Sequence, residues 1–158
     1  MFKTRLPLKK NYYEEYLRWY FKSAEGTINI SRTTMLGKFI TALAVPIEYP
    51  VKEQAGMLIA IPAYDSDLHK NKFYTFTPDV VDKINDMIEF YFDSDLREWC
   101  LVGGELNMQR KDIYSMFLKN RNLKEHNEIF EMIKKRDWRR RTKMKEILLN
   151  AMQSIDNL

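Results

Sequence analysis

The chain has 158 residues, of which 45% are hydrophobic and 13% aromatic, so it is not a disordered protein and can form one domain with its own core. Its single cysteine, Cys100, excludes an intrachain disulfide framework, and no apolar run approaches the ~18 residues of a membrane span. Residues 1–105 carry 13 basic and 15 acidic groups, whereas residues 106–158 carry 13 basic and 7 acidic groups. The basic character therefore belongs to the C-terminal third.

The first part of the chain predicts a helix, a short strand and a second helix. Asn11 is a candidate N-cap with Glu14 as its capping-box partner, and Gly26 is a stop signal beyond the helical pattern. Residues 27–31 alternate as a short strand. Residues 34–44 carry apolar side chains at helical spacing, which predicts the second helix.

Two further apolar runs, 57–61 and 72–76, are rich in strand-forming residues. A loop opened by Pro46 and Pro50 precedes them, and the polar stretch 62–71 between them fits a hairpin loop. The sequence therefore predicts a small antiparallel sheet in the N-terminal half.

From residue 77 onward the pattern becomes helical. Thr77, Pro78 and Asp79 supply an N-cap, a first-turn proline and a first-turn acid. The helices expected in this half begin at Thr77, Asp95, Gln109 and Lys124. The glycines at 103 and 104 either end the second of these helices or permit close helix packing.

The fold class predicted from these elements is α+β, mainly helical, with a small N-terminal antiparallel sheet and helix–turn–helix-like helices at the C-terminus. We expect a single domain over residues 1–158. It would comprise a helix-and-sheet portion, 1–76, and a helical portion, 77–158, which ends in a basic helix.

The last segment has an apolar stripe that is interrupted by charge. At about 100° per residue, Ile133 and Met144 share a helix face, and Asp137, Arg140 and Arg141 fall between them on that face. Burial of an unpaired guanidinium is costly. Either the helix breaks near Asp137, or a continuous helix leaves the core there, and both alternatives expose the basic residues.

The densest charge feature is the stretch 134–145, in which eight of twelve residues are Lys or Arg. Such side chains neutralise phosphates, and Trp138 could stack on a base or pack against a neighbouring helix. A solvated helix face is the alternative reading of the charge. Helices over 109–120 and 124–136 would form a wide helix–turn–helix pair. The predicted nucleic-acid-binding residues are Lys134, Lys135, Arg136, Trp138, Arg139, Arg140, Arg141, Lys143, Lys145, Arg110, Lys111, Arg121 and Lys124.

The acidic segment 77–105 suggests a different use of the basic stretch. It holds eight Asp or Glu residues against two basic ones, Lys83 and Arg97. The segment could be a solvated outer face, or it could dock the basic helix of another copy. The second alternative would make the protein a homo-oligomer or an assembly component.

No residue pattern points to catalysis, a metal or a cofactor. Cys100 lies on an apolar helical stretch, so we expect a buried, inert thiol. Asp65, Asp67 and His69 alternate in one loop, but such triplets are common in solvent-exposed loops. His126 lacks a second ligand at metal-binding spacing. We therefore predict no enzyme activity and no metal site.

Six short segments between residues 27 and 145 carry a resemblance to a known group of proteins. They span residues 30–34, 36–38, 72–74, 77–78, 111–113 and 133–139. In their order they resemble small helix–turn–helix-like proteins of Bacteroidetes phages and mobile elements. The resemblance implies a phage or mobile-element origin and transfers no catalytic residue.

The leading hypothesis is a non-enzymatic nucleic-acid-binding protein, with DNA favoured, that contacts phosphates through its basic C-terminal helix. The alternative is a structural or assembly protein of a phage particle whose basic helix docks on an acidic protein partner. The first ten residues lack the apolar run of a signal peptide, so we expect a cytoplasmic location and no membrane partner. In a phage-encoded protein this would be the host-cell cytoplasm.

Overall fold

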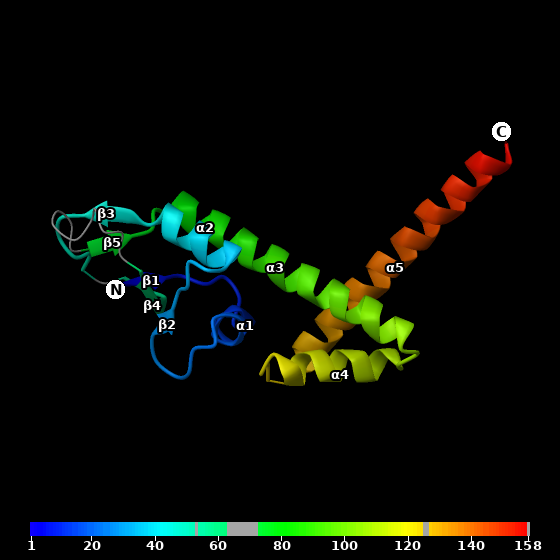
Figure 1. Ribbon diagram of the computed structural model, residues 1–158, viewed down its shortest axis with the longest axis horizontal. Helices are drawn as coiled ribbons and strands as arrows, with labels where there is room; N and C mark the ends of the chain where they lie inside the picture. Colours follow the sequence, from blue (N-terminus) through cyan, green and yellow to red (C-terminus); the bar gives the residue numbers. More distant parts are fainter. Residues whose placement is uncertain (53, 63–72, 125–126, 158) are drawn as a thin grey trace. The chain divides into compact units, whose positions relative to one another are not determined.

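The computed structural model describes residues 1–52, 54–62, 73–124 and 127–157. The chain divides into two compact units, Met1–Asp93 and Ser94–Leu158. The long helix α3 (Pro78–Glu105) contributes residues to both (Figure 1). Five helices and two small sheets make up the described residues, which confirms the α+β prediction. No helix in this part of the chain is long and apolar enough to span a membrane.

The first unit contains two small sheets. In the larger one, β4 (Met57–Ile61) lies between β1 (Phe2–Leu6), which is antiparallel to it, and β2 (Ile28–Asn29), which is parallel. In the smaller one, β3 (Val45–Ile47) pairs antiparallel with β5 (Phe73–Thr75). The strands expected at 57–61 and 72–76 are thus present, but their predicted pairing as a hairpin is wrong.

The burial of β4 explains this difference. Ile59, Ala60 and Ile61 are all buried, as is typical of a strand covered on both faces. Both edges of β4 are occupied, by β1 and β2, so no edge remains for β5. The residues around Pro46, where the sequence predicted that a loop opens, instead form β3, the partner of β5.

The beginning of the first helix also differs from the expectation. The first unit holds α1 (Tyr12–Tyr20) and α2 (Met35–Leu43). Asn11 precedes α1, but its side chain makes no cap hydrogen bond to any described residue. Glu14 instead accepts a hydrogen bond from Arg18 at 2.7 Å, so the predicted capping box is wrong. α2 is capped as its sequence suggests, because Thr34 accepts from the Gly37 amide at 3.1 Å.

Helix α3 is one continuous helix of 28 residues, so the separate helix expected from Asp95 is not formed. Its buried apolar side chains recur every four residues without interruption and are Ile84, Ile88, Phe92, Leu96 and Cys100. Each step of four residues advances the stripe by about 40° around the helix axis, so the buried side chains wind along α3, and neither Asp95 nor Glu98 interrupts them. The acids therefore lie beside the stripe and do not start a new helix.

The second unit is built from the end of α3, α4 (Arg110–Asn120) and α5 (Asn127–Asp156). Gly103 permits the close packing of α3 on α4, because a Cβ there would lie 2.7 Å from Ile113 side-chain carbons. Helix α4 matches the predicted helix over 109–120, whereas α5 begins three residues later than Lys124.

Helix α5 runs unbroken for 30 residues, so the second alternative for the region of Asp137 is correct. Ile129, Ile133 and Asp137 are buried against the rest of the unit. Every residue from 142 to 157 is exposed. The helix therefore leaves the core after Arg141, and its last turns extend beyond α4 (Figure 1).

Candidate nucleic-acid interface

A pocket of about 380 Å³ lies between α4 and α5 in the second unit. Its cationic lining residues are Arg110, Lys111, Lys134, Lys135 and Arg141. Its aromatic lining residues are Tyr114, Phe130 and Trp138, and its one acid is Glu131. Six of the thirteen predicted nucleic-acid-binding residues thus come together around one cavity.

The spacing along both helices explains why these side chains meet. On α5 the lining positions 130, 131, 134, 135, 138 and 141 follow one another at steps of one, three or four residues and fall within about 140° of the helix circumference, which places them on one face. On α4, Tyr114 follows Arg110 by one helical turn. The pocket is therefore a furrow between two helix faces, with cations from both helices.

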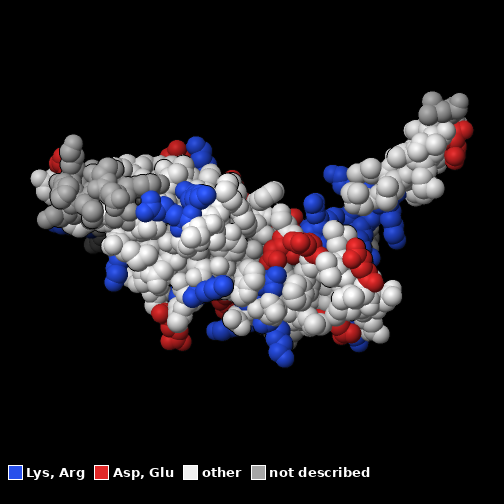
Figure 2. All heavy atoms as spheres, in the orientation of Figure 1, with Lys and Arg blue, Asp and Glu red and all other residues white. Residues whose placement is uncertain are grey.

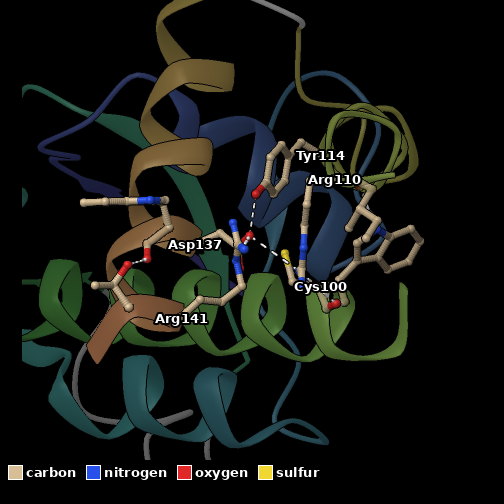
Figure 3. A network of polar contacts seen from close by, with 9 residues as sticks. Cys100, Arg110, Tyr114, Asp137 and Arg141 are labelled. Atoms are coloured by element: carbon tan, nitrogen blue, oxygen red, sulfur yellow. Dashed lines mark hydrogen bonds and ion pairs between the residues drawn. The ribbon is translucent and has the colours of Figure 1, made fainter. Parts of the chain in front are cut away.

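A buried carboxylate fixes two of these cations (Figure 3). Asp137 is 2% exposed, and its Oδ2 accepts a hydrogen bond from the Tyr114 hydroxyl. The Nε of Arg141 donates to the same oxygen at 3.1 Å, and Nη1 of Arg110 lies 3.5 Å from it. A carboxylate removed from water needs such partners, so the interruption of the apolar stripe at Asp137 is a satisfied ionic cluster.

The same cluster leaves the pocket positively charged. The side chains of Arg110 and Arg141 are each 38% exposed, whereas the Asp137 side chain is 3% exposed. The five lining cations outnumber the two carboxylates, Glu131 and Asp137, by three. The charge of Asp137 is therefore buried beneath the two arginines, and Glu131 is the one acid that lines the pocket surface.

Burial keeps the neighbouring acid groups in their neutral forms. It raises the pKa of the Tyr114 hydroxyl to about 12, and the hydrogen bond to Asp137 acts in the same direction. Burial likewise raises the pKa of the Cys100 thiol to about 12, with a further contribution from the Asp137 charge. Tyr114 is thus a permanent hydrogen-bond donor at neutral pH, and Cys100 is buried as expected.

Trp138 lies at the rim of the pocket. Trp138 is 59% exposed. Packing against a neighbouring helix, the predicted alternative to base stacking, would instead have covered the indole. The ring of Tyr114 meets that of Phe130 edge-on, with 5.8 Å between their centroids. The exposed indole is therefore the aromatic surface on which a flat ligand could stack.

The remaining cations of the basic stretch divide between two sides of α5. At about 100° per residue, Lys145 shares the face of Lys134 and prolongs the pocket side toward the C-terminus. Those on the other side, none of which lines the pocket, are Arg136, Arg139, Arg140 and Lys143. In Figure 2, Lys and Arg gather over the middle of α5, and the turns beyond are drawn mainly white.

Arg121 has a different role from the one predicted for it. Its guanidinium is buried and bonds to both carboxylate oxygens of Asp95, at 2.8 Å and 2.7 Å. It also stacks over the rings of Trp99 and Phe117, 4.8 Å and 5.2 Å from their centroids. Arg121 therefore holds α3 and α4 together, and it does not face a ligand. Lys124 is exposed and lies outside the pocket.

Two positions of the site could not have been found from the charge pattern. Tyr114 and Phe130 are the aromatic lining residues that the predicted binding residues did not include. Their only signal was their place on the apolar faces of two successive helices.

Neither a metal site nor a known family identifies the protein. Among the described residues, no group of three or more His, Cys, Asp or Glu could hold a metal ion. Asp65, Asp67, His69 and His126 lie outside the described residues. The chain matches no protein-family model, and its comparison with curated proteins and solved structures finds no match either. The resemblance to phage proteins stays a prediction.

Proposed function

We propose that the protein is a non-enzymatic nucleic-acid-binding protein, with DNA as its ligand, and that the pocket between α4 and α5 receives the phosphate backbone. One observation carries this proposal: five cations and an exposed indole surround a single furrow that has one lining acid, Glu131, while a second acid, Asp137, is buried beneath the cations. Phosphate contacts release counterions, which is the main source of affinity for such a surface.

The cations of the pocket are suited to different parts of the task. Lys111, Lys134 and Lys135 are exposed and can follow a phosphate as flexible point charges. Arg110 and Arg141 are held by Asp137, so their donors are already oriented. Trp138 beside them offers a stacking surface for a base or a sugar.

The contact that this arrangement favours runs along the flank of α5. In helix–turn–helix proteins the first residues of the second helix reach the bases. Here the described start of α5 holds Glu128, Ile129 and Phe130, and the cations begin only at Lys134. We therefore propose phosphate contact through the middle of α5, whether or not the α4–α5 pair docks as a helix–turn–helix.

The alternative, an assembly protein whose basic helix docks on an acidic partner, has less support from the acidic residues of α3. Glu89 accepts hydrogen bonds from Tyr12, Tyr13 and Lys10. Asp95 is engaged by Arg121. These carboxylates serve the chain's own packing, so the segment 77–105 offers fewer acids to another copy. A phage or mobile-element origin remains a proposal based on the sequence resemblance.

A titration with a fluorescently labelled oligonucleotide at several salt concentrations tests the proposal. If about three phosphates are neutralised in the pocket, log affinity for duplex DNA falls with log salt with a slope near −3, or near −2 for a single strand. The Trp138→Ala variant should weaken binding to the single strand more than binding to the duplex. Failure to bind either ligand at low salt would refute the proposal.

A further inference from the structure

The exposed end of α5 carries an apolar stripe that no described residue of the second unit covers. The stripe consists of Met144, Ile147, Leu148, Ala151, Met152 and Ile155. Its five large side chains are between 48% and 68% exposed. At about 100° per residue these positions prolong the face on which Ile129 and Ile133 are buried. The core-facing side of α5 thus continues past the point where the core ends.

The stripe is symmetric about its own midpoint, which lies between Leu149 and Asn150. Reversing the segment 142–157 about that midpoint exchanges Met144 with Ile155, Ile147 with Met152, and Leu148 with Ala151. Every apolar position of the stripe therefore returns to an apolar position.

The charged residues of this segment fit the same reversal. Lys145 and Asp156 lie on the same flank of the stripe, about 90° and 110° from its centre, and the reversal brings Lys145 of one copy to within two residues of Asp156 of the other. A two-fold interface requires this kind of self-complementarity, because residue i must contact residue j in both directions. A parallel arrangement would instead bring Lys143 of one copy beside Lys145 of the other.

We infer that the stripe is an interface for a second copy of this chain, in which two α5 helices pair antiparallel across residues 144–155. In this pair Met144 of one copy lies against Ile155 of the other, and Leu148 lies against Ala151. Lys145 of each copy approaches Asp156 of the other. The apolar face that leaves the core in one chain is covered by the same face of its partner.

The size of the stripe sets the strength of this association. Five aliphatic or thioether side chains correspond to roughly 500 Å² of apolar surface per copy, or about 1,000 Å² for the pair. Stable interfaces bury about 1,200–2,000 Å², so the pair lies just below that class. The expected species is a reversible dimer whose population rises with protein concentration.

Antiparallel pairing also sets the distance between the two basic stretches. The stretch 134–145 is centred about ten residues from the midpoint of the stripe, so a rise of 1.5 Å per residue places the two stretches about 30 Å apart. One turn of duplex DNA is about 34 Å long. The two stretches could then contact phosphates one helical turn apart, a consequence that rests on the proposed function, whereas the dimer itself does not.

Sedimentation velocity of the full chain without nucleic acid tests the dimer. The wild-type protein should pass from monomer to dimer between about 5 and 500 µM, in keeping with its interface area. Leu148→Glu should raise the dissociation constant at least about tenfold, because it places a charge within the apolar contact. Leu149→Glu is the matched control, since Leu149 is equally exposed but lies about 130° from the centre of the stripe.

A wild-type protein that stays monomeric throughout this range would overturn the inference, and so would an equal effect of the two glutamate variants. Because no nucleic acid is present, these outcomes leave the proposed function untouched. Conversely, a dimer that fails to bind an oligonucleotide would refute the proposed function alone.

Disulfide trapping tests the antiparallel direction. Met144→Cys and Ile155→Cys, prepared as single variants and mixed in equal amounts under mild oxidation, should give a covalent heterodimer. Neither variant alone should cross-link efficiently, and the buried thiol of Cys100 stays out of reach. Efficient cross-linking of each variant to itself would show a parallel pair and contradict the antiparallel interface.

Discussion

The second unit contains two Asp–Arg clusters that differ in which charge is hidden. In the Arg121–Asp95 pair the guanidinium is covered, with its side chain 9% exposed, and two aromatic rings lie against it. Around Asp137 the carboxylate is covered, and the guanidiniums of Arg110 and Arg141 reach the surface. The same two residue types thus join helices in one place and present positive charge in the other.

This difference shows why charge density alone does not define a binding surface. Arg121 belongs to the basic part of the sequence, but burial and pairing remove it from any ligand. Arg110 and Arg141 are also paired, but their partner lies beneath them, so their outer donors stay exposed to solvent. The position of the acid decides whether an arginine stabilises the fold or faces a ligand.

The largest expected effect on stability comes from Asp137→Ala. The substitution removes the carboxylate that accepts the Tyr114 hydroxyl and leaves Arg110 and Arg141 without their shared anion. We expect the free energy of unfolding to fall by about 3 kcal/mol, measured by urea denaturation. Asp137→Asn, which keeps an acceptor but no charge, should lose less. A loss below about 0.5 kcal/mol for the alanine variant would show that the cluster does not stabilise the unit.

Arg121→Met should have the next largest effect. It leaves Asp95 without its bidentate partner while keeping aliphatic contact with Trp99. We expect a loss of about 2 kcal/mol in urea denaturation, because Asp95 keeps some access to water. The salt dependence of oligonucleotide binding should be unchanged. A flatter salt slope would place Arg121 at the ligand and break the distinction between the two clusters.

Tyr114→Phe should cost less, about 1 kcal/mol, because Asp137 keeps both arginine partners. The variant should also change the alkaline stability profile. The pKa of Tyr114 rises from its ordinary 10.0 to about 12 on folding, so the unfolded chain loses this proton first. The contribution to stability is then full below pH 10 and lost as the pH rises toward 12. Thermal unfolding at a series of pH values should show a shallower fall for the variant, and identical profiles would contradict this assignment.

Leu148→Glu should have the smallest effect on the stability of the monomer. Leu148 is 57% exposed and contacts nothing in the core, so the change in unfolding free energy should stay within about 0.5 kcal/mol. Urea denaturation at low protein concentration, where the monomer dominates, is the suitable measurement. A loss of more than about 1 kcal/mol would mean that the end of α5 folds back onto the unit.

Periodicity predicted the helices well because local spacing determines which face is buried. Helix α4 lies where it was expected, and the phase of α5 correctly placed Asp137 on the core face. The same reasoning could not identify Tyr114 as its partner, because 23 residues separate the two and their meeting depends on how α4 packs. The alternative of a helix break at Asp137 stayed open for the same reason.

Strand pairing was less predictable from local signals. The strand β1 alternates buried Thr4 and Leu6 with exposed Lys3 and Arg5, a pattern too short and too polar to stand out. Its pairing with β4 joins residues more than 50 positions apart. The number of cations in the basic stretch is known from the sequence. Which of them lie on the pocket side of α5 could not be predicted, because that depends on the position of α4.

The most direct test of the proposed binding site compares two double variants that change the net charge equally. Lys134→Ala with Lys135→Ala removes two exposed cations of the pocket, whereas Lys38→Ala with Lys83→Ala removes two exposed cations elsewhere. In a salt titration of duplex binding, the pocket variant should flatten the slope by about two units, and the control should leave it nearly unchanged. Equal slopes for the two variants would contradict a specific phosphate site between α4 and α5.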